Sequence, residues 1–159
     1  MDYLDSLAVA NWFIDTARAS GEYITAMKLQ KLIYFAHGWY LALYDKPLVK
    51  EQVEAWQWGP VFPGIYNVAK QYGSSPIDSH LFSVFGDCRL INKDDTRIQF
   101  LERIWNVYGK YTASQLSRMT HEPNGPWDKT VKQYPGRKNV DIDEKLIKES
   151  FKFKIENSN

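Results

Sequence analysis

The sequence predicts a compact, mainly α-helical single domain of about five to six helices with a short β-hairpin or small antiparallel sheet. Two observations predict this class. Apolar residues recur at helical spacing in several separate stretches, whereas the alternation of a strand is confined to short segments near residues 53–58 and 80–92. The chain also has 159 residues, a size that suits one domain and lets about 68–70% of the unfolded surface be buried. We expect the domain to span residues 1–155 and residues 156–159 to form a frayed tail.

The first two helices are expected at residues 4–19 and 26–44. Along the first, apolar residues recur at helical spacing, and Gly21 lies just past its end, where a helix stop is expected. Thr25 is a suitable N-cap for the second helix. The segment Asp45–Pro47 then ends it.

The second helix carries a single apolar stripe, and Lys28, Gln30 and Lys31 lie largely off it. Gly38 lies inside the helix, where glycine costs about 1 kcal/mol relative to alanine. A close helix–helix crossing at this position would explain why glycine is tolerated. The stripe consists of Leu29, Leu32, Ile33, Ala36, Tyr40 and Leu43.

The segment EAWQWGPVFPGIYN, residues 54–67, combines strand, turn and helix signals. Alternation over residues 53–58 predicts a short strand with Trp56 and Trp58 on one face. Gly59-Pro60 is expected to stop that strand. Pro63 is then well placed as the first residue of a helix that runs to about residue 71, because its missing N–H is harmless there.

The second half of the chain predicts three more helices. Before them, residues 80–92 are weakly patterned and could form a hairpin across Gly86-Asp87. The run of turn residues EPNGP follows the second of the three. The helices are expected from Asp94 or Asp95 to Tyr108, from the N-cap Thr112 to His121, and from Asp143 to Phe153.

Charge argues against a general nucleic-acid binder. The net charge is +1, so the chain as a whole does not attract polyanions, and nucleic acid is not the expected partner. A local basic run is interpreted as a solvated face. The alternative is electrostatic contact with an acidic partner or with RNA. The run consists of Lys129, Lys132, Arg137 and Lys138.

Cysteine usage and hydropathy predict a cytoplasmic protein. Cys88 is the single cysteine, so no intramolecular disulfide can form, which fits a reducing compartment. The N-terminus lacks the basic region of a signal peptide. No apolar run approaches the roughly 20 residues that span a bilayer, so no membrane contact is expected.

No group of residues has the spacing of a catalytic, metal or cofactor site. Cys88 could meet His121 in space, but its neighbours match no catalytic motif, and a buried structural thiol is the simpler interpretation. His37 and His80 are far from each other and from His121 in sequence, and one cysteine cannot build a cysteine-rich zinc site. Phosphate-binding glycine motifs are absent, and the carboxylates stand at predicted helix starts as caps. We expect no enzymatic activity, cofactor or metal.

Aromatic residues exceed what a minimal core needs, because the chain has six Trp, ten Tyr and eight Phe. Some are therefore expected on a partner-binding surface. Trp56 and Trp58 cannot both lie deep if their strand is an edge. One of them would fill the core against Ile33 or Tyr40, and the other would line a rim. The remaining rim residues would be Phe62 and Tyr66.

A second candidate contact is the block THEPNGPW, residues 120–127. His121 ends a predicted helix, where its charged form is stabilised. Trp127 is expected to pack over it. Tryptophan is a frequent interface anchor, so both residues are candidates for partner contact; the structural alternative is that the block holds the last layer of the fold in place.

Three blocks in this order resemble the Panacea domain of SocA-like antitoxins, a family whose members are often phage-associated. The blocks are MKLQKLIYFAHGWYLAL (27–43), EAWQWGPVFPGIY (54–66) and LSRMTHEPNGPW (116–127). The resemblance therefore extends from the second helix to Trp127, and the last part of the chain has no counterpart in it.

The resemblance implies an antitoxin of a toxin–antitoxin system, mostly helical with a small β element, that binds a toxin encoded beside it. Occlusion of the toxin and its presentation to a protease are both open mechanisms, and self-association is a further possible contact. The alternatives are a nucleic-acid-binding regulator and an uncharacterised enzyme associated with mobile elements. The expected partner-binding residues are Trp56, Trp58, Phe62, Tyr66, His121 and Trp127.

Overall fold

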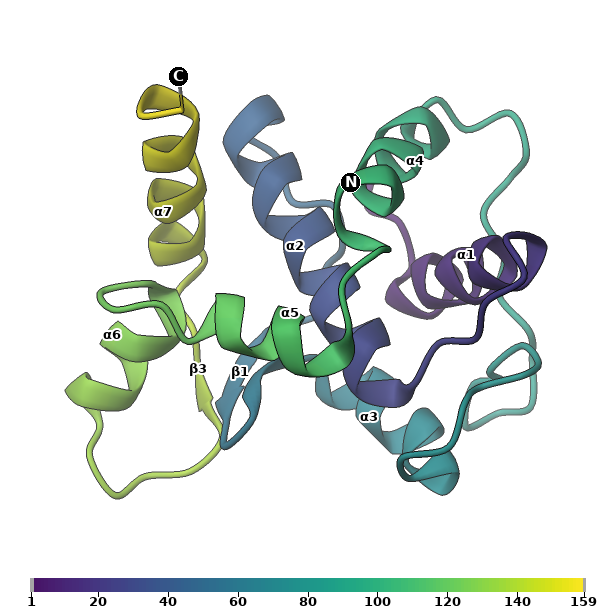
Figure 1. Ribbon diagram of the computed structural model, residues 1–159, viewed down its shortest axis with the longest axis horizontal. Coiled ribbons are helices and arrows are strands. Elements are labelled where there is room, and N and C mark those ends of the chain that lie inside the picture. Colours follow the sequence, from purple (N-terminus) through teal and green to yellow (C-terminus); the bar gives the residue numbers. More distant parts are fainter. Residues whose placement is uncertain (1, 159) are drawn as a thin grey trace.

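The computed structural model describes residues 2–158, and its central element is α2 (Ala26–Tyr44), around which the other elements pack (Figure 1). Every residue from 29 to 38 is buried, because α2 has neighbours on all its sides. Gln30 and Lys31 are therefore buried even though they lie off the predicted apolar stripe. The neighbours are α1 (Ser6–Ala19), α3 (Pro63–Ala69), α4 (Arg97–Tyr108), α5 (Ala113–Thr120), α7 (Glu144–Glu156) and strand β2 (Gly59–Val61).

Four helix starts follow capping residues in the sequence, but α4 begins at Arg97 after Thr96, which makes no side-chain cap bond, and not directly after the predicted cap Asp94 or Asp95. Thr25 Oγ1 accepts from Lys28 N at 3.3 Å, which confirms the predicted start of α2. Thr112 caps α5 in a complete capping box. Asp143 caps α7, so the last helix begins where the sequence predicts. Asp5 caps α1, which makes that helix start at Ser6, two residues after the predicted residue 4.

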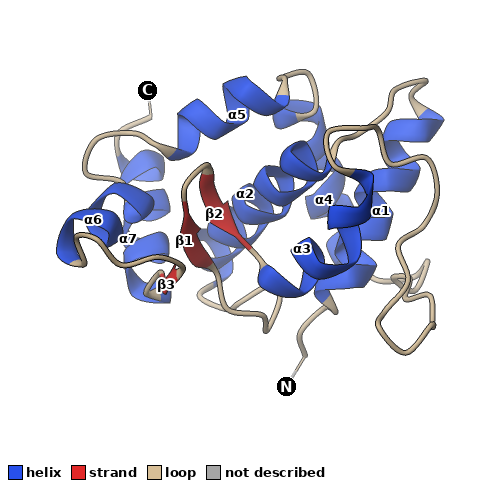
Figure 2. Ribbon diagram, turned by 90° about the horizontal axis from the view of Figure 1, so that it is seen from below, coloured by secondary structure: helices blue, strands red, loops and turns tan. Residues whose placement is uncertain are grey.

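A small antiparallel sheet contains β2, β1 (Glu54–Trp56) and β3 (Val140–Asp141), in the order β2-β1-β3. The prediction that Gly59-Pro60 stops the strand is wrong, because Gly59 begins β2, which returns alongside β1 (Figure 2). Pro60 is tolerated because β2 is an edge strand, where a missing N–H need not break the ladder. Gly59 has φ +115°, a conformation that favours glycine.

The described residues contain seven α-helices, so the mainly α class with a small antiparallel sheet is confirmed and one helix is added. The added helix is α6 (Pro126–Gln133), in which Pro126 occupies the first turn, where proline suits a helix. A 3-10 turn, Lys70–Tyr72, extends α3. The predicted hairpin at 80–92 is reduced to a single bridge between Phe82 and Cys88.

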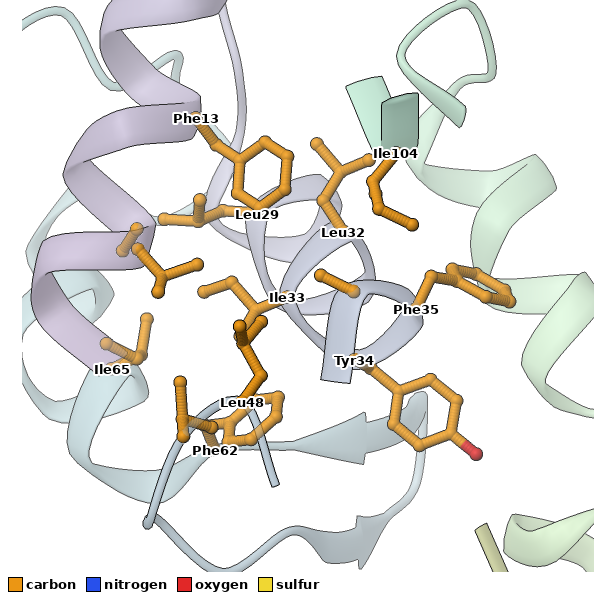
Figure 3. Packing of buried hydrophobic residues seen from close by; sticks show 14 of the residues in the cluster. Phe13, Leu29, Leu32, Ile33, Tyr34, Phe35, Leu48, Phe62, Ile65 and Ile104 are labelled. Carbon is orange, nitrogen blue, oxygen red and sulfur yellow. The ribbon is translucent and has the colours of Figure 1, made fainter. Parts of the chain in front are cut away.

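The core lies where α1, α2, α3 and α4 meet, and Figure 3 shows its aromatic and aliphatic side chains around α2. Gly38 supports the predicted close crossing: a Cβ at this position would lie 2.3 Å from the ring of Phe151 on α7. Helix α7 continues to Glu156, into the segment 156–159 that was expected to be a frayed tail. Asn159 of that segment lies outside the described residues.

Candidate functional site

A groove of about 710 Å³ lies beside the β1–β2 hairpin, and we call it the aromatic groove. Four aromatic and three cationic side chains line it: Trp56, Trp58, Tyr66, Trp127, Lys31, Arg137 and Lys138. No Asp or Glu is among its lining residues within 2–158. The other lining residues are Ala26, Met27, Gln30, Ala55, Gln57, Val61, Gly73, Val131 and Asn139. The groove is thus apolar and electropositive, and it contains four of the six residues expected to bind a partner.

The groove is built from segments that are distant in the sequence. Figure 2 shows the hairpin between α3 on one side and α6 on the other. The N-terminal turns of α2 contribute Lys31, and the loop after α6 contributes Arg137 and Lys138. The pairing of β3 with β1 fixes the end of that loop beside the hairpin.

Trp56 and Trp58 both line the groove, but not as two residues of one strand face. Strand β1 ends at Trp56, and Trp58 lies in the turn with 61% of its surface exposed. Trp56 packs against Tyr66 with ring centroids 4.7 Å apart. The indole Nε1 of Trp56 donates to Glu54 Oε1 at 2.9 Å. The prediction that one tryptophan fills the core is wrong, because neither belongs to the core cluster.

Trp127 also lines the groove, and His121 packs against its ring. The two rings lie 4.0 Å apart between centroids. His121 Nδ1 donates to Ser117 O at 2.6 Å and so caps the end of α5, as the structural interpretation of this block predicts. His121 itself is not among the residues that line the groove.

Phe62 is wrongly predicted as a rim residue, because its side chain is fully buried in the core (Figure 3). Its backbone is held on both sides by Gln30, whose Nε2 donates to Phe62 O at 3.1 Å and whose Oε1 accepts from Phe62 N at 2.8 Å. This pair of bonds turns the Phe62 ring toward α2. The strand alternation of the sequence could not show it, since the chain reverses at residues 57–58.

Lys31 is the groove residue that sequence reasoning missed. Only 1% of its surface is exposed, and Nζ donates to Pro60 O at 3.0 Å. Within residues 2–158 it forms no salt bridge, and its burial lowers its pKa to about 8. The sequence shows only that it lies largely off the apolar stripe of α2. Only the packing of partners around all of α2 reveals that it is enclosed.

The predicted basic run divides into two parts. Arg137 and Lys138 line the groove, with the Arg137 guanidinium 5.5 Å from the ring centre of Tyr134. Lys129 and Lys132 lie on α6 and are not among the groove residues. Lys132 pairs with Asp128 on the same helix at 2.9 Å.

Cys88 is exposed and lies beside His80, so the interpretation as a buried thiol is wrong, as is the possible pairing with His121. Cys88 Sγ is 3.6 Å from His80 Nδ1, and His80 Nε2 is 2.7 Å from Asp15 Oδ1. Neither Cys88 nor His80 lines the aromatic groove. Another cavity lies beside α1, between Trp12 and Leu90, and neither residue lines that one either. The same loop carries the most exposed aromatic ring of the described residues, Phe85, with 87% of its surface exposed.

Within residues 2–158, no three His, Cys, Asp or Glu side chains lie close enough together to hold a metal ion. None of its helices combines the length and the apolar composition that crossing a bilayer requires.

Comparison with known proteins gives a family match and a curated relative. Residues 29–128 match the family model described as "Antitoxin SocA-like, Panacea domain". The chain is 34% identical over 158 residues to Antitoxin SocA of Caulobacter vibrioides (strain NA1000 / CB15N), with 94% of this chain and 84% of the relative covered. No solved structure matches the chain.

The family match coincides with most of the aromatic groove. It includes Lys31, Trp56, Trp58, Tyr66 and Trp127, whereas Arg137 and Lys138 lie beyond its end at residue 128. It also includes the three sequence blocks that resemble the Panacea domain, apart from the first two residues of the first block. The chain therefore belongs to the SocA-like antitoxin family that is defined by the Panacea domain.

Proposed function

We propose that this protein is an antitoxin that neutralises a cognate toxin by direct protein–protein contact, and that the toxin docks in the aromatic groove. The observation that carries the proposal is the grouping of Trp56, Trp58, Tyr66 and Trp127 around one open, apolar groove. A protein of this size rarely exposes so many large rings together without a partner for them. Membership of an antitoxin family supports a toxin as that partner.

The groove also has the rigidity that favours tight docking. Gln30 holds the hairpin to α2, and the Trp127 indole Nε1 donates to Trp56 O at 2.7 Å. Binding to a surface that is already ordered costs less conformational entropy than binding to mobile side chains. Trp58, at the tip of the hairpin and most exposed of the four rings, is then the expected anchor.

The test is co-expression of this protein with the toxin encoded by the neighbouring gene, scored by cell growth, followed by calorimetry on the purified pair. The Trp58→Ala variant should bind the toxin about 30-fold or more weakly and lose protection. Its thermal stability should change little, because the ring is exposed. Phe85→Ala is the matched control: it removes another exposed ring outside the groove and should bind normally.

Three other results would contradict the proposal. If the protein encoded by the neighbouring gene is harmless when expressed alone and forms no complex, it is not a toxin partner. If Trp58→Ala binds the toxin normally and Phe85→Ala binds it weakly, the toxin contacts the loop around Cys88 and not the groove. Salt-sensitive binding of a short RNA, with no toxin complex, would favour a nucleic-acid-binding regulator. Where a complex forms, the toxin level measured beside toxin activity separates occlusion from removal by a protease.

A further inference from the structure

We propose that the floor of the aromatic groove is a carboxylate-binding site, in which Lys31 pairs with an Asp or Glu side chain of an acidic segment of the toxin. This inference rests on the proposed function, because it names the chemistry of the segment that would occupy the groove. It concerns a residue that is buried and charged, and for which residues 2–158 supply no counter-charge.

The ammonium group of Lys31 has hydrogen-bonding capacity that the described residues do not use. An ammonium has three N–H donors, and Pro60 O is the one acceptor that residues 2–158 provide. Gly59 lies directly against it: a Cβ there would be 3.2 Å from Nζ. Glycine at this position lets Lys31 and Thr120 pack closely against the β2 backbone, and Lys31 lines the groove from there.

Holding β2 against α2 does not require a charge. The adjacent residue Gln30 performs that task for Phe62 with a neutral amide. A buried ammonium without a counter-ion is unfavourable, because it loses its hydration and gains no ion pair. Ionisable groups that line a cleft and have a strongly shifted pKa are typical of functional sites. A ligand carboxylate would supply both the missing acceptor and the missing charge.

The remaining walls favour an acidic peptide segment as the occupant. Arg137 and Lys138 add positive charge at the side formed by the loop after α6, and no Asp or Glu among the described residues lines the groove. The four rings provide apolar contact for neighbouring side chains of the same segment. Three cations and a net charge of +1 are few for a site that follows a phosphate backbone, which favours a protein ligand over a nucleic acid.

The pairing predicts a defined pH dependence of toxin affinity. In the free protein the Lys31 pKa is about 8, and a carboxylate beside it raises that pKa. Affinity should therefore be greatest below pH 8 and should fall as the pH rises through the pKa of the complex. The other ionisable groups that line the groove are Tyr66, Arg137 and Lys138, and His121 lies behind Trp127.

The experiment measures toxin binding by calorimetry for the wild type, Lys31→Met and Lys31→Gln. Methionine keeps an unbranched apolar side chain that reaches as far as Cε and lacks only the ammonium, and glutamine keeps a neutral N–H donor. Both should bind about 30-fold or more weakly, because a buried charge pair loses one partner. Lys28→Met is the control on the same helix: Lys28 Nζ donates to Gly109 O and does not line the groove.

A scan of the toxin locates the carboxylate. Each Asp or Glu of the toxin is replaced by Asn or Gln and combined with Lys31→Met in a double-mutant cycle. Replacement of one acidic toxin residue should weaken binding to the wild-type protein, and the same replacement should hardly change the affinity for Lys31→Met. The decline of affinity above pH 8 should also disappear in Lys31→Met.

The possible outcomes separate the two proposals. If wild type and both Lys31 variants bind the toxin equally, the carboxylate site is disproved and the antitoxin function stands. If the wild type itself does not bind, the proposed function fails and the inference fails with it. Lys31-dependent binding of a short single-stranded oligothymidylate, in competition with the toxin, would overturn the acidic segment in favour of a nucleic acid.

Discussion

The indole Nε1 of Trp127 donates a hydrogen bond of 2.7 Å to the main-chain oxygen of Trp56. This bond joins the start of α6 to the end of β1, two elements that are far apart in the sequence. It also fixes the distance between two walls of the aromatic groove. A conservative change at Trp127 should therefore alter both stability and recognition.

Trp127→Phe removes the donor and leaves the Trp56 carbonyl without it. We expect the free energy of unfolding to fall by about 1–2 kcal/mol, because a partly buried acceptor loses its partner. Chemical denaturation measures the change. Trp12→Phe is the control, since the Trp12 indole makes no hydrogen bond within residues 2–158; equal losses in the two variants would contradict the role of the bond.

Gly38→Ala should destabilise the protein by about 1–3 kcal/mol, although alanine is the better helix former. The reason is steric: the new Cβ would lie 2.3 Å from the Phe151 ring, which is itself fully buried. Thermal unfolding measures the loss. In the Phe151→Leu background, where the ring is gone, Gly38→Ala should cost less stability than it does in the wild type. If the losses of the two single variants simply add in the double variant, the clash is not the cause.

Gly59→Ala should cost about 1–3 kcal/mol for two reasons. The residue has φ +115°, and its Cβ would lie 2.8 Å from Thr120 Oγ1 and 3.0 Å from Lys31 Cε. Gly86→Ala provides the comparison, because Gly86 also has a positive φ but open space around it. A smaller loss for Gly86→Ala in urea denaturation would show the cost of the contacts with Thr120 and Lys31, whereas equal losses would leave backbone strain as the whole effect.

Lys31→Met should increase the free energy of unfolding at pH 7 by about 1–3 kcal/mol. Burial lowers the Lys31 pKa from 10.5 to about 8, a difference worth about 3 kcal/mol against the charged form. Loss of the bond to Pro60 O offsets part of the gain. The stable variant would then be the one that fails to bind, a trade-off expected where a site is held in an unfavourable state.

The pH dependence of this gain has a definite sign. Below pH 8 both the folded and the unfolded states carry the proton, so the destabilisation by Lys31 is complete. Between pH 8 and 10.5 the unfolded state binds more protons, so wild-type stability rises relative to Lys31→Met. Denaturation of the two proteins across this range should show the difference shrinking; a constant difference would show that Lys31 does not titrate there.

The helices could be predicted largely because their signals are local. Thr25 and Thr112 cap their helices through bonds to residues three positions away, and Pro63 occupies a first turn. Such features depend on neighbours in the sequence, so one sequence is enough to find them.

Long-range pairing is what the sequence did not reveal. Strand β3 is two residues long and exists only because it pairs with β1. Phe62 is buried because Gln30 binds its backbone, and Lys31 is buried because partners surround α2. The aromatic composition did identify four groove residues, but it could not separate them from Phe62, whose chemistry is the same and whose environment is not.

The loop that follows α6 forms one side of the groove yet lies beyond residue 128, where the family match ends. The loop is held at its two ends by short elements, α6 before it and the two-residue strand β3 after it. This side of the groove therefore lies outside the family match, whereas Lys31 and the hairpin, which line the rest of the groove, lie within it. If the proposed docking in the groove is correct, chimeras that exchange only residues 134–139 between relatives should change which toxin is bound.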